Sequence, residues 1–279
     1  MWLFSDKVLV RDSGLLDGFR DCHCHLLPGV DDGVQEVDET MQILEEWESL
    51  GVKEVWLTPH IMEDIPNEPE ELKKKFETLT KEFTVDSLPF TESRKKITLH
   101  QAAEHMMDGL FLKRLEEGNV VPYNSLQFTV SCAPQVLRRA SSESGLQEAQ
   151  GDYDKGSGKL LVETSYYTPP MNMGDIIERI KSKGYEPILA HPERYQYMDK
   201  PDYNRLKQRG VLLQLNLPSL VGAYGPLVMK KAEWLLKENM YDYCGSDTHS
   251  MNQVELFLSS EISKKIVKKV KKIAENQGF

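Results

Sequence analysis

The segment 21–33 places two histidines on alternate positions, just before a glycine-containing turn, and its letters read DCHCHLLPGVDDG. Side chains at positions i and i+2 of a β-strand point to the same face. His23 and His25 can therefore converge on one divalent ion, while Cys22 and Cys24 turn away into the packing. A histidine pair with this spacing is common by chance. Taken alone, it more often marks two polar strand residues than a pair of metal ligands.

The same arrangement recurs at other predicted strand ends. Three further apolar runs, residues 55–60, 188–191 and 241–249, each deliver a histidine or an aspartate just before a turn. Two more, residues 99–104 and 159–163, end in a glutamate. The carboxyl ends of parallel strands form the reactive rim of α/β proteins. We therefore expect side chains from six strands to meet there as ligands of a metal site. The residues concerned are His23, His25, His60, Glu104, Glu163, His191, Asp247 and His249.

The composition fits a soluble enzyme folded as one domain over residues 1–279. With 40% apolar and 28% charged residues, such a chain can bury a large core, and α/β barrels commonly reach this length. No apolar stretch reaches the roughly 18 residues of a membrane helix, and the first residues lack a signal-peptide pattern. We therefore expect a cytoplasmic protein without membrane insertion. The net charge of −10 argues against a nucleic-acid partner, which requires clustered Lys and Arg.

Helical patterns alternate with these strands. They cover residues 36–51, 69–83, 173–183, 201–209, 224–239 and 253–276. Gly51 is the expected C-cap of the first helix and leads directly into the strand at 52–57. Repeated helix–strand units with right-handed crossovers predict a barrel-like parallel sheet. An open doubly wound sheet is the alternative.

Residues 125–158 interrupt this alternation of helices and strands. They are rich in Ser, Gln and Gly and show no clear periodicity beyond 127–130. A structureless loop of this length is unusual inside a compact domain. We interpret the segment as a surface insertion or a disordered loop.

Taken together and in this order, the motifs resemble the polymerase-and-histidinol-phosphatase (PHP) superfamily. They are HCHLLPGVDDG at 23–33, TPH at 58–60, AE at 103–104, LVE at 161–163, AHPER at 190–194 and SDTH at 246–249. The first motif is similar to that of the manganese-dependent protein-tyrosine phosphatases of bacterial capsule and exopolysaccharide systems. The resemblance covers nearly the whole chain, except its first twenty residues and residues 125–158.

The resemblance implies a distorted (β/α)7 barrel, the PHP fold, which holds three metal ions. It places His23, His25, Glu104 and Asp247 on the first ion, Glu104, Glu163 and His191 on the second, and Asp32, His60 and His249 on the third. Imidazole and carboxylate ligands without thiolate suit Mn²⁺, with Fe or Zn²⁺ as alternatives.

Three acidic residues have competing structural interpretations. Asp31 and Asp32 precede Gly33, where both can serve as turn and N-cap residues. We expect Asp31 to do so and Asp32 to bind metal. Glu163 ends an apolar strand, where an unpaired carboxylate is costly to bury, so a metal ion is its simplest partner.

Arg194 follows the His-Pro-Glu element and, by the resemblance, binds phosphate, since its planar fork fits phosphate oxygens. The alternative is an ion pair with Glu193 or another nearby acid. The family pattern usually has a second arginine soon after the Asp-x-His motif, but residues 250–254 contain none. Lys264 or Lys265 is the candidate replacement.

The activity that the resemblance implies is hydrolysis of phosphotyrosine by a metal-activated hydroxide, without a cysteine nucleophile. The implied partner is a phosphotyrosine protein, namely a bacterial tyrosine autokinase that controls polysaccharide export. Some relatives are oligomeric, so a homo-oligomer stays open. Two alternatives are a small-molecule phosphoesterase of the histidinol-phosphatase type, with an enclosed pocket, and a catalytically weakened regulatory homologue.

Overall fold

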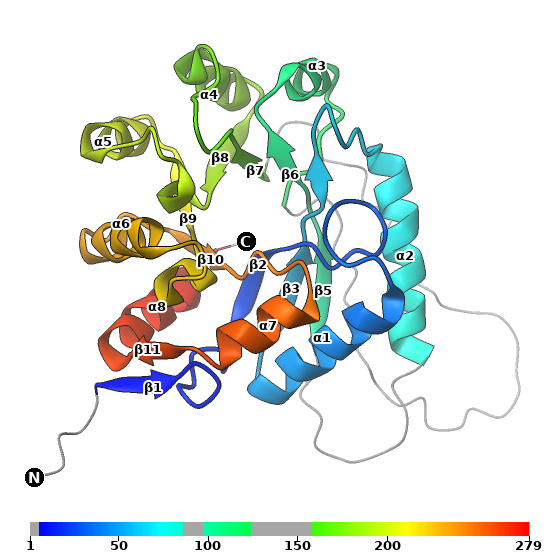
Figure 1. Cartoon of the computed structure of the whole chain (residues 1–279). Helices are drawn as coiled ribbons and strands as arrows, with labels where there is room; N and C mark the ends of the chain where they lie inside the picture. Colours follow the sequence, from blue (N-terminus) through cyan, green and yellow to red (C-terminus); the bar gives the residue numbers. More distant parts are fainter. Residues whose placement is uncertain (1–5, 86–96, 124–157, 279) are drawn as a thin grey trace, which may run out of the picture.

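The computed structural model describes residues 6–85, 97–123 and 158–278. The insertion predicted at 125–158 therefore lies outside the described residues, apart from Gly158 at the start of a strand. Figure 1 shows the strands at the centre of the molecule, with helices α1 to α8 arranged around them.

Strands and helices alternate along most of the chain, as the sequence predicts. The strands are β1 (Lys7–Leu9), β2 (Arg20–Cys24), β3 (Glu54–Leu57), β4 (His60–Ile61), β5 (Thr98–Gln101), β6 (Glu104–Met106), β7 (Gly158–Glu163), β8 (Tyr185–Ala190), β9 (Leu212–Asn216), β10 (Tyr243–Gly245) and β11 (Glu261–Ser263). The helices are α1 (Val37–Leu50), α2 (Pro69–Val85), α3 (Gly109–Glu117), α4 (Met173–Ser182), α5 (Lys200–Gln208), α6 (Pro226–Lys237), α7 (Met251–Leu258) and α8 (Lys264–Asn276). Two 3₁₀ helices, η1 (Pro192–Arg194) and η2 (Leu217–Val221), follow β8 and β9.

The central strands form two parallel sheets that share two segments of chain. One sheet has the order β10-β9-β8-β7-β6-β4, and the other has the order β2-β3-β5. β3 pairs with β5 and β4 pairs with β6, so segments 54–61 and 98–106 stay side by side through both sheets. Pro59 separates β3 from β4 because a proline has no N–H to offer the ladder.

The closed (β/α)7 barrel expected from the sequence is not found among the described residues. β2 and β10 lie side by side (Figure 1), but a single parallel bridge joins Cys24 to Thr248. Beyond β10 the backbone leaves the strand conformation, since Asp247 has a φ of 53°. The regular ladder therefore cannot continue there, and the fold is an α/β arrangement of parallel sheets.

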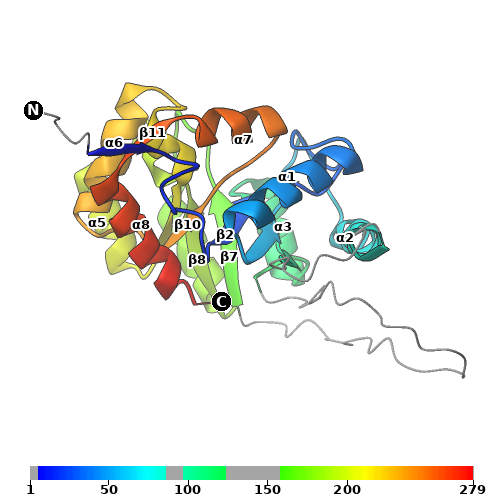
Figure 2. The same cartoon turned by 90° about the horizontal axis from the view of Figure 1, so that it is seen from below.

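Side chains join β2 to β10 where the ladder does not. The carboxylate of Asp21 accepts hydrogen bonds from Ser246 N at 2.8 Å and Ser246 Oγ at 2.6 Å. The buried amide of Gln277 accepts from Cys244 N at 2.6 Å and donates to Arg20 O at 2.9 Å. Figure 2 shows α7 at one end of the strands and the last turn of α8, which precedes Gln277, toward the other. Both side-chain contacts lie near the start of β2, and backbone bonds from His25 N to Thr248 O and from Asp247 N to His23 O join the two segments beyond them.

Two buried clusters lie on opposite faces of the strands. The larger one includes Leu160 and Val162 together with residues of the helices, and the smaller one contains Trp56, Tyr123 and Leu161. Successive strand residues point to opposite faces, so Leu161 faces away from the helices, into the space that the strands enclose. Large side chains fill that space, which is therefore a packed core and not a channel.

The helices predicted for α1, α2, α4, α5 and α6 are confirmed to within a few residues. Gly51 caps α1 as expected, with a φ of 94° and its N–H directed at the carbonyls of Trp47 and Glu48. None of the described helices is long and apolar enough to cross a lipid bilayer.

The C-terminal part of the chain differs from the prediction. The helix predicted over 253–276 is wrong in its middle, where residues 261–263 form β11 and pair antiparallel with β1. Ile262 is buried opposite Val8, so burial in this pair outweighs the helical pattern. Helix α3 was not predicted, although Asp108 is a clear N-cap signal in the sequence.

We predict that Gln277→Ala lowers the free energy of unfolding by about 1–3 kcal/mol, because Cys244 N and Arg20 O lose their buried partner. Urea denaturation followed by circular dichroism measures this loss. The matched control is Asn276→Ala: this amide is exposed and bonds only within α8, to Lys272 O. The control should change stability by less than about 0.5 kcal/mol. Equal losses for the two variants would argue against a joining role for Gln277.

Candidate metal centre

The structure brings all nine predicted ligands to the carboxyl ends of the parallel strands. Their side chains are buried, except that Asp32 is exposed and His249 is half-buried. As the sequence predicts, the side chains come from six strands. β2, β7, β8 and β10 contribute through their last residues or the turn that follows, whereas His60 and Glu104 are the first residues of β4 and β6, just beyond the ends of β3 and β5. The residues are His23 and His25 at β2, His60 in β4, Glu104 in β6, Glu163 in β7, His191 after β8, and Asp247 and His249 after β10, with Asp32 in the turn that follows β2.

The residues that the sequence assigns to a first ion form one compact group. His23 Nε2 lies 3.1 Å from His25 Nε2, 3.2 Å from Glu104 Oε2 and 3.5 Å from Asp247 Oδ1. His25 Nε2 lies 3.4 Å from each of the same two carboxylate oxygens. Ligand atoms about 2.1 Å from a shared ion lie roughly 3–3.5 Å apart at bond angles of about 90–110°. The spacing of these four groups therefore fits an ion between them.

A second group surrounds the other oxygen of Glu104. His191 Nε2 lies 3.0 Å from Glu104 Oε1 and 3.8 Å from Glu163 Oε2. His60 also reaches this group, because its Nδ1 lies 3.2 Å from Glu104 Oε2 and 3.1 Å from Glu163 Oε1. The sequence placed His60 in the third group alone, so this contact is an addition from the structure.

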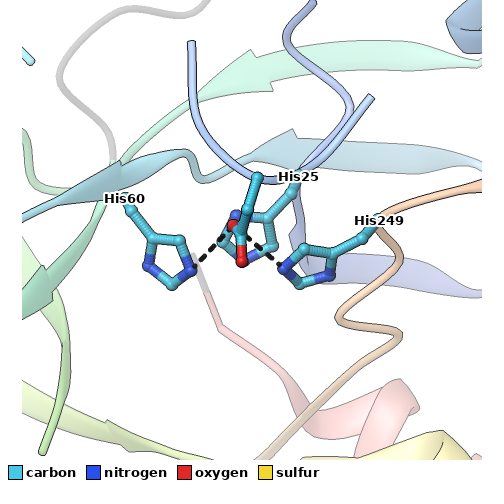
Figure 3. Close-up of side chains that lie close together, drawn as sticks. His25, His60 and His249 are labelled. Atoms are coloured by element: carbon cyan, nitrogen blue, oxygen red, sulfur yellow. Dashed lines mark ion pairs between the residues drawn. The ribbon is translucent and has the colours of Figure 1, made fainter. Parts of the chain in front are cut away.

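The third group lies nearest the solvent. Asp32 Oδ1 is 3.5 Å from His60 Nε2 and 3.6 Å from His249 Nε2. Figure 3 shows the rings of His25, His60 and His249 gathered around these contacts. His25 stacks on His249 with ring centroids 4.0 Å apart, so it too belongs to this group.

The residues present fit divalent metal ions. Among the described residues, four buried atoms of the predicted ligands have no hydrogen-bond partner: His191 Nδ1, and His60 Nδ1, Glu104 Oε2 and Glu163 Oε1, of which the last three lie close together. Buried polar atoms without partners are rare in proteins, and a cation satisfies nitrogen and oxygen lone pairs together. The donor set contains imidazole and carboxylate but no thiolate, which suits Mn²⁺, Fe or Zn²⁺.

In the metal-free protein, the electrostatics of the site raise the pKa of His23 and lower those of Asp247 and His249. Burial by itself lowers the pKa of His23, but the carboxylates of Glu104 and Asp247 outweigh it and raise that pKa to about 9. Burial favours a high pKa for Asp247, yet His23, His25 and their neighbours hold it well below its usual range. For His249, burial and the charge of His25 lower the pKa to about 4.

Two buried side chains orient the first pair of histidines. Asp31 Oδ2 accepts from His25 Nδ1 at 2.8 Å and from His60 N at 3.0 Å. The expectation that Asp31 is an N-cap is wrong, since α1 starts later with Glu36 at its N-cap. Asp31 does shape the turn, because Oδ1 accepts from Gly33 N at 3.0 Å. Its main contact nevertheless fixes the ring of His25.

Gln214 does the same for His23 and was not predicted. Its Oε1 lies 3.0 Å from His23 Nδ1 and 3.3 Å from His191 N, so one amide holds two predicted ligands. A fully buried glutamine within the apolar run of β9 was the available signal. Gly245 faces the same histidine, and a Cβ there would lie 2.6 Å from His23 Cβ, so only glycine permits this approach.

Strained backbone marks two of the predicted ligands. His191 and Asp247 have φ values of 32° and 53°, in the left-handed region that non-glycine residues rarely adopt. Such strain persists only where surrounding contacts enforce it. At Asp247 one such contact is the hydrogen bond from its N to His23 O, at 2.7 Å.

Arg194 borders a cavity of about 340 Å³ that opens onto the cluster. Its Nη1 donates to Asp247 Oδ2 at 2.8 Å, so the expected alternative, an ion pair with a nearby acid, is formed, but with Asp247 in place of Glu193. Burial works against the charge of Arg194, yet Asp247 and neighbouring tyrosines raise its pKa further. Lys264 and Lys265 are not among the described residues that line this cavity, so they do not replace the second arginine.

A parallel α/β fold with clustered imidazoles and carboxylates at its strand ends defines a candidate multinuclear metal protein. The family comparison is more specific. The model of the family described as "Capsular polysaccharide synthesis, CpsB/CapC" matches residues 19–132 and 129–276, and this chain belongs to that family.

Similar proteins carry related names. Tyrosine-protein phosphatase CpsB of Streptococcus agalactiae is 23% identical over 267 residues, covering 93% of this chain and 94% of the relative. Tyrosine-protein phosphatase YwqE of Bacillus subtilis is 21% identical over 234 residues, covering 83% and 77%. A crystal structure from the pair YwqE of Bacillus subtilis and CpsB of Streptococcus pneumoniae, described as "unique metal-dependent tyrosine phosphatases", superposes with a TM-score of 0.64 at 19% identity. It covers 93% of this chain and 95% of that one, and shows that the fold is shared.

We predict that Mn²⁺ binding releases protons and tightens as the pH rises from 7 to 9. His23 keeps its proton in the metal-free protein because its pKa is about 9, and a metal ion requires the neutral ring. Raising the pH removes the competing proton, so the apparent dissociation constant falls. Isothermal titration calorimetry in two buffers of different ionisation enthalpy counts the protons. An affinity that is constant over this range would contradict the prediction.

We predict that Gln214→Leu weakens Mn²⁺ binding by about 10–100-fold, since His23 loses the acceptor that orients its ring. Gln214→Glu retains an acceptor for His23 Nδ1 and should bind more tightly than the leucine variant. Gln208→Leu, at an exposed position at the end of α5, is the matched control and should bind as the wild type does. Equal affinity for the leucine and glutamate variants would show that the acceptor is unimportant.

Proposed function

We propose that this chain is a metal-dependent protein-tyrosine phosphatase of capsular or exopolysaccharide biosynthesis. The observation that carries the proposal is that Arg194 lines the same cavity as six of the nine predicted ligands. A phosphate group in this cavity meets a guanidinium fork and a cluster of metal-type ligands together. Membership of the capsular polysaccharide synthesis family and the names of the relatives support the same activity.

We propose three divalent ions, with Mn²⁺ first and Fe or Zn²⁺ as alternatives. The first is held by His23, His25, Glu104 and Asp247, the second by Glu104, Glu163 and His191, and the third by Asp32, His60 and His249. When bound, divalent ions supply Lewis acidity toward water and toward the phosphate oxygens. The close contacts of His60 with the second group support ions that share ligands.

The chain's own residues bind and orient the substrate. Arg194 keeps its charge under all ordinary conditions and presents a planar set of donors to the phosphate oxygens. Its contact with Asp247 ties this fork to the predicted ligands, so phosphate and ions are held in one frame. Phosphoryl transfer depends chiefly on such positioning and on neutralisation of charge.

A cysteine nucleophile is not required and does not fit the site. The three thiols of the described residues, Cys22, Cys24 and Cys244, are buried, and none of them lines the cavity. Burial raises the pKa of each thiol well above its usual value, which disfavours the thiolate that attacks phosphorus.

The rim of the cavity suits a polypeptide better than a small enclosed ligand. Tyr166 lines the cavity, and the following residues of the same loop include Tyr167, 70% exposed, and Met171, 91% exposed. Exposed apolar side chains in the loop that supplies Tyr166 to the cavity offer contacts to residues that flank a phosphotyrosine. This supports a protein substrate over histidinol phosphate. We propose a cytoplasmic tyrosine autokinase as that substrate, and leave assembly into a homo-oligomer to measurement.

We also propose that residues 1–279 form one domain of the PHP type. The support is the ring-like arrangement of helices around the strands, with β2 beside β10 (Figure 1), and the coverage of the chain by its relatives. In this proposal the distorted (β/α)7 barrel is completed by the side-chain contacts between β2 and β10 instead of by a regular ladder.

The test is a phosphatase assay on phosphotyrosine peptide and on histidinol phosphate, with protein stripped of metal and then loaded with Mn²⁺, Fe²⁺ or Zn²⁺. We expect metal-dependent turnover with a clear preference for the peptide. A preference for histidinol phosphate would support the small-molecule alternative. Stoichiometric metal binding without hydrolysis of any activated aryl phosphate would support the regulatory alternative.

His23→Ala should abolish turnover and leave the fold intact, since it removes one of the first-ion ligands at the centre of the cluster. His100→Gln is the matched control, because His100 contacts Glu54 and does not line the cavity. The control should keep wild-type activity. Retention of more than about a tenth of the wild-type rate by His23→Ala, a barrier rise below about 1.4 kcal/mol, would count against its role.

A further inference from the structure

We propose that Tyr166 and Tyr224 are positioning residues that clamp the guanidinium of Arg194 and so fix its phosphate-binding edge in the cavity. The inference rests on the proposed function, and it names the residues that control phosphate affinity at that site. The guanidinium contacts both rings: Arg194 Cζ is 4.3 Å from the ring centroid of Tyr166 and 4.2 Å from that of Tyr224.

The clamp is assembled from three separate parts of the chain. Tyr166 lies in the loop between β7 and α4, Arg194 ends η1, and Tyr224 lies between η2 and α6. All three side chains line the 340 Å³ cavity. Contacts among three separate elements cannot arise from local sequence preference, so they require the tertiary fold. Both rings are mostly buried, and burial raises the pKa of the Tyr224 hydroxyl to about 12.

A ring of contacts restrains the guanidinium within its plane. Arg194 Nη1 donates to Asp247 Oδ2 at 2.8 Å, and the same oxygen accepts from Asn216 Nδ2 at 2.7 Å. Asn216 Nδ2 also donates to Tyr224 OH at 3.2 Å. Hydrogen bonds therefore connect Arg194 through Asp247 and Asn216 to Tyr224, and the ring of Tyr224 in turn contacts Arg194. Stacking sets the plane of the guanidinium, and the carboxylate sets its rotation within that plane.

Other aromatic side chains hold the ring of Tyr166 in place. Tyr166 packs against the ring of Tyr195, with centroids 6.1 Å apart, and against His191 at 5.7 Å. Tyr195 is fully buried and donates from its hydroxyl to Ala190 O at 2.9 Å. The clamp is therefore anchored to the end of β8, beside a predicted ligand.

Restraint matters because this site has one arginine. Among the described residues that line the cavity, Arg194 is the single Lys or Arg side chain. A long side chain that is already ordered loses little conformational entropy when it binds phosphate. Contact with an aromatic face also stabilises the cation, and the Arg194 donors other than the Nη1 proton given to Asp247 stay available for phosphate oxygens. One fixed fork can then hold a phosphate monoester that a mobile side chain would hold weakly.

The experiment compares leucine and phenylalanine at both positions in the full-length protein loaded with Mn²⁺. Tyr166→Leu and Tyr224→Leu remove the ring face and should raise KM for p-nitrophenyl phosphate about three- to thirty-fold, with kcat changed less than about threefold. Tyr166→Phe and Tyr224→Phe keep the ring face and should raise KM less than the leucine variants do, although Tyr224→Phe also loses the hydroxyl that accepts from Asn216 Nδ2. Leu227→Ala is the control, since this side chain of α6 is 79% exposed and does not line the cavity.

A double-mutant cycle with Arg194→Met shows whether the rings act through the arginine. If they do, Tyr166→Leu adds little once Arg194 is gone, so the two effects are far from additive. The inhibition or binding constant for inorganic phosphate, measured on the same variants by calorimetry, gives a readout that does not require turnover. Urea denaturation of each variant confirms that the protein is folded.

Three results would overturn the proposal: unchanged KM and phosphate affinity in both leucine variants, equal losses in the leucine and phenylalanine variants, or additive effects with Arg194→Met. These outcomes are distinct from failure of the proposed function. If the wild type turns over no aryl phosphate, that function fails, while phosphate binding to the variants still decides whether the clamp exists.

Discussion

The buried carboxylate of Glu104 is the interaction on which the rest of the centre depends. Its two oxygens lie within 3.4 Å of nitrogens from four histidines, namely His23, His25, His60 and His191. A carboxylate with no exposed surface is costly to bury unless positive charge surrounds it. The surrounding imidazoles, or ions among them, provide that charge. The cluster is therefore a set of groups that are unfavourable singly and compatible only together.

The architecture serves this requirement by bringing several strand ends to one place. β4 and β6 pair His60 with Glu104 in register, and β6 and β7 bring Glu163 alongside. Between β2 and β10 there is no regular hydrogen-bonded ladder. The backbone there turns through the left-handed conformation of Asp247, which directs its carboxylate at His23 and His25. Side-chain hydrogen bonds to Asp21 and Gln277, together with the backbone bond from Asp247 N to His23 O, keep the two edges together.

The sequence predicted well wherever a local rule applies. Alternation along a strand places His23 and His25 together, and runs that end in His or Glu mark the strand ends, because both signals depend on neighbouring residues alone. The prediction failed where distant residues decide. Asp31 was expected to cap a helix but orients His25, Gln214 was not noticed, and a strand replaces the middle of the predicted last helix.

By itself the sequence determined which side chains can act as ligands, on which strand ends they lie, and that the strands alternate with helices. Only the tertiary structure decided which ligands share space, that Arg194 pairs with Asp247 in contact with two aromatic rings, and that side-chain hydrogen bonds join β2 to β10. The physical reason is the sequence separation over which each kind of interaction acts. Backbone propensity and side-chain alternation act over a few residues, whereas burial of charge is settled among groups up to 225 positions apart, as in the bond from Ser246 to Asp21.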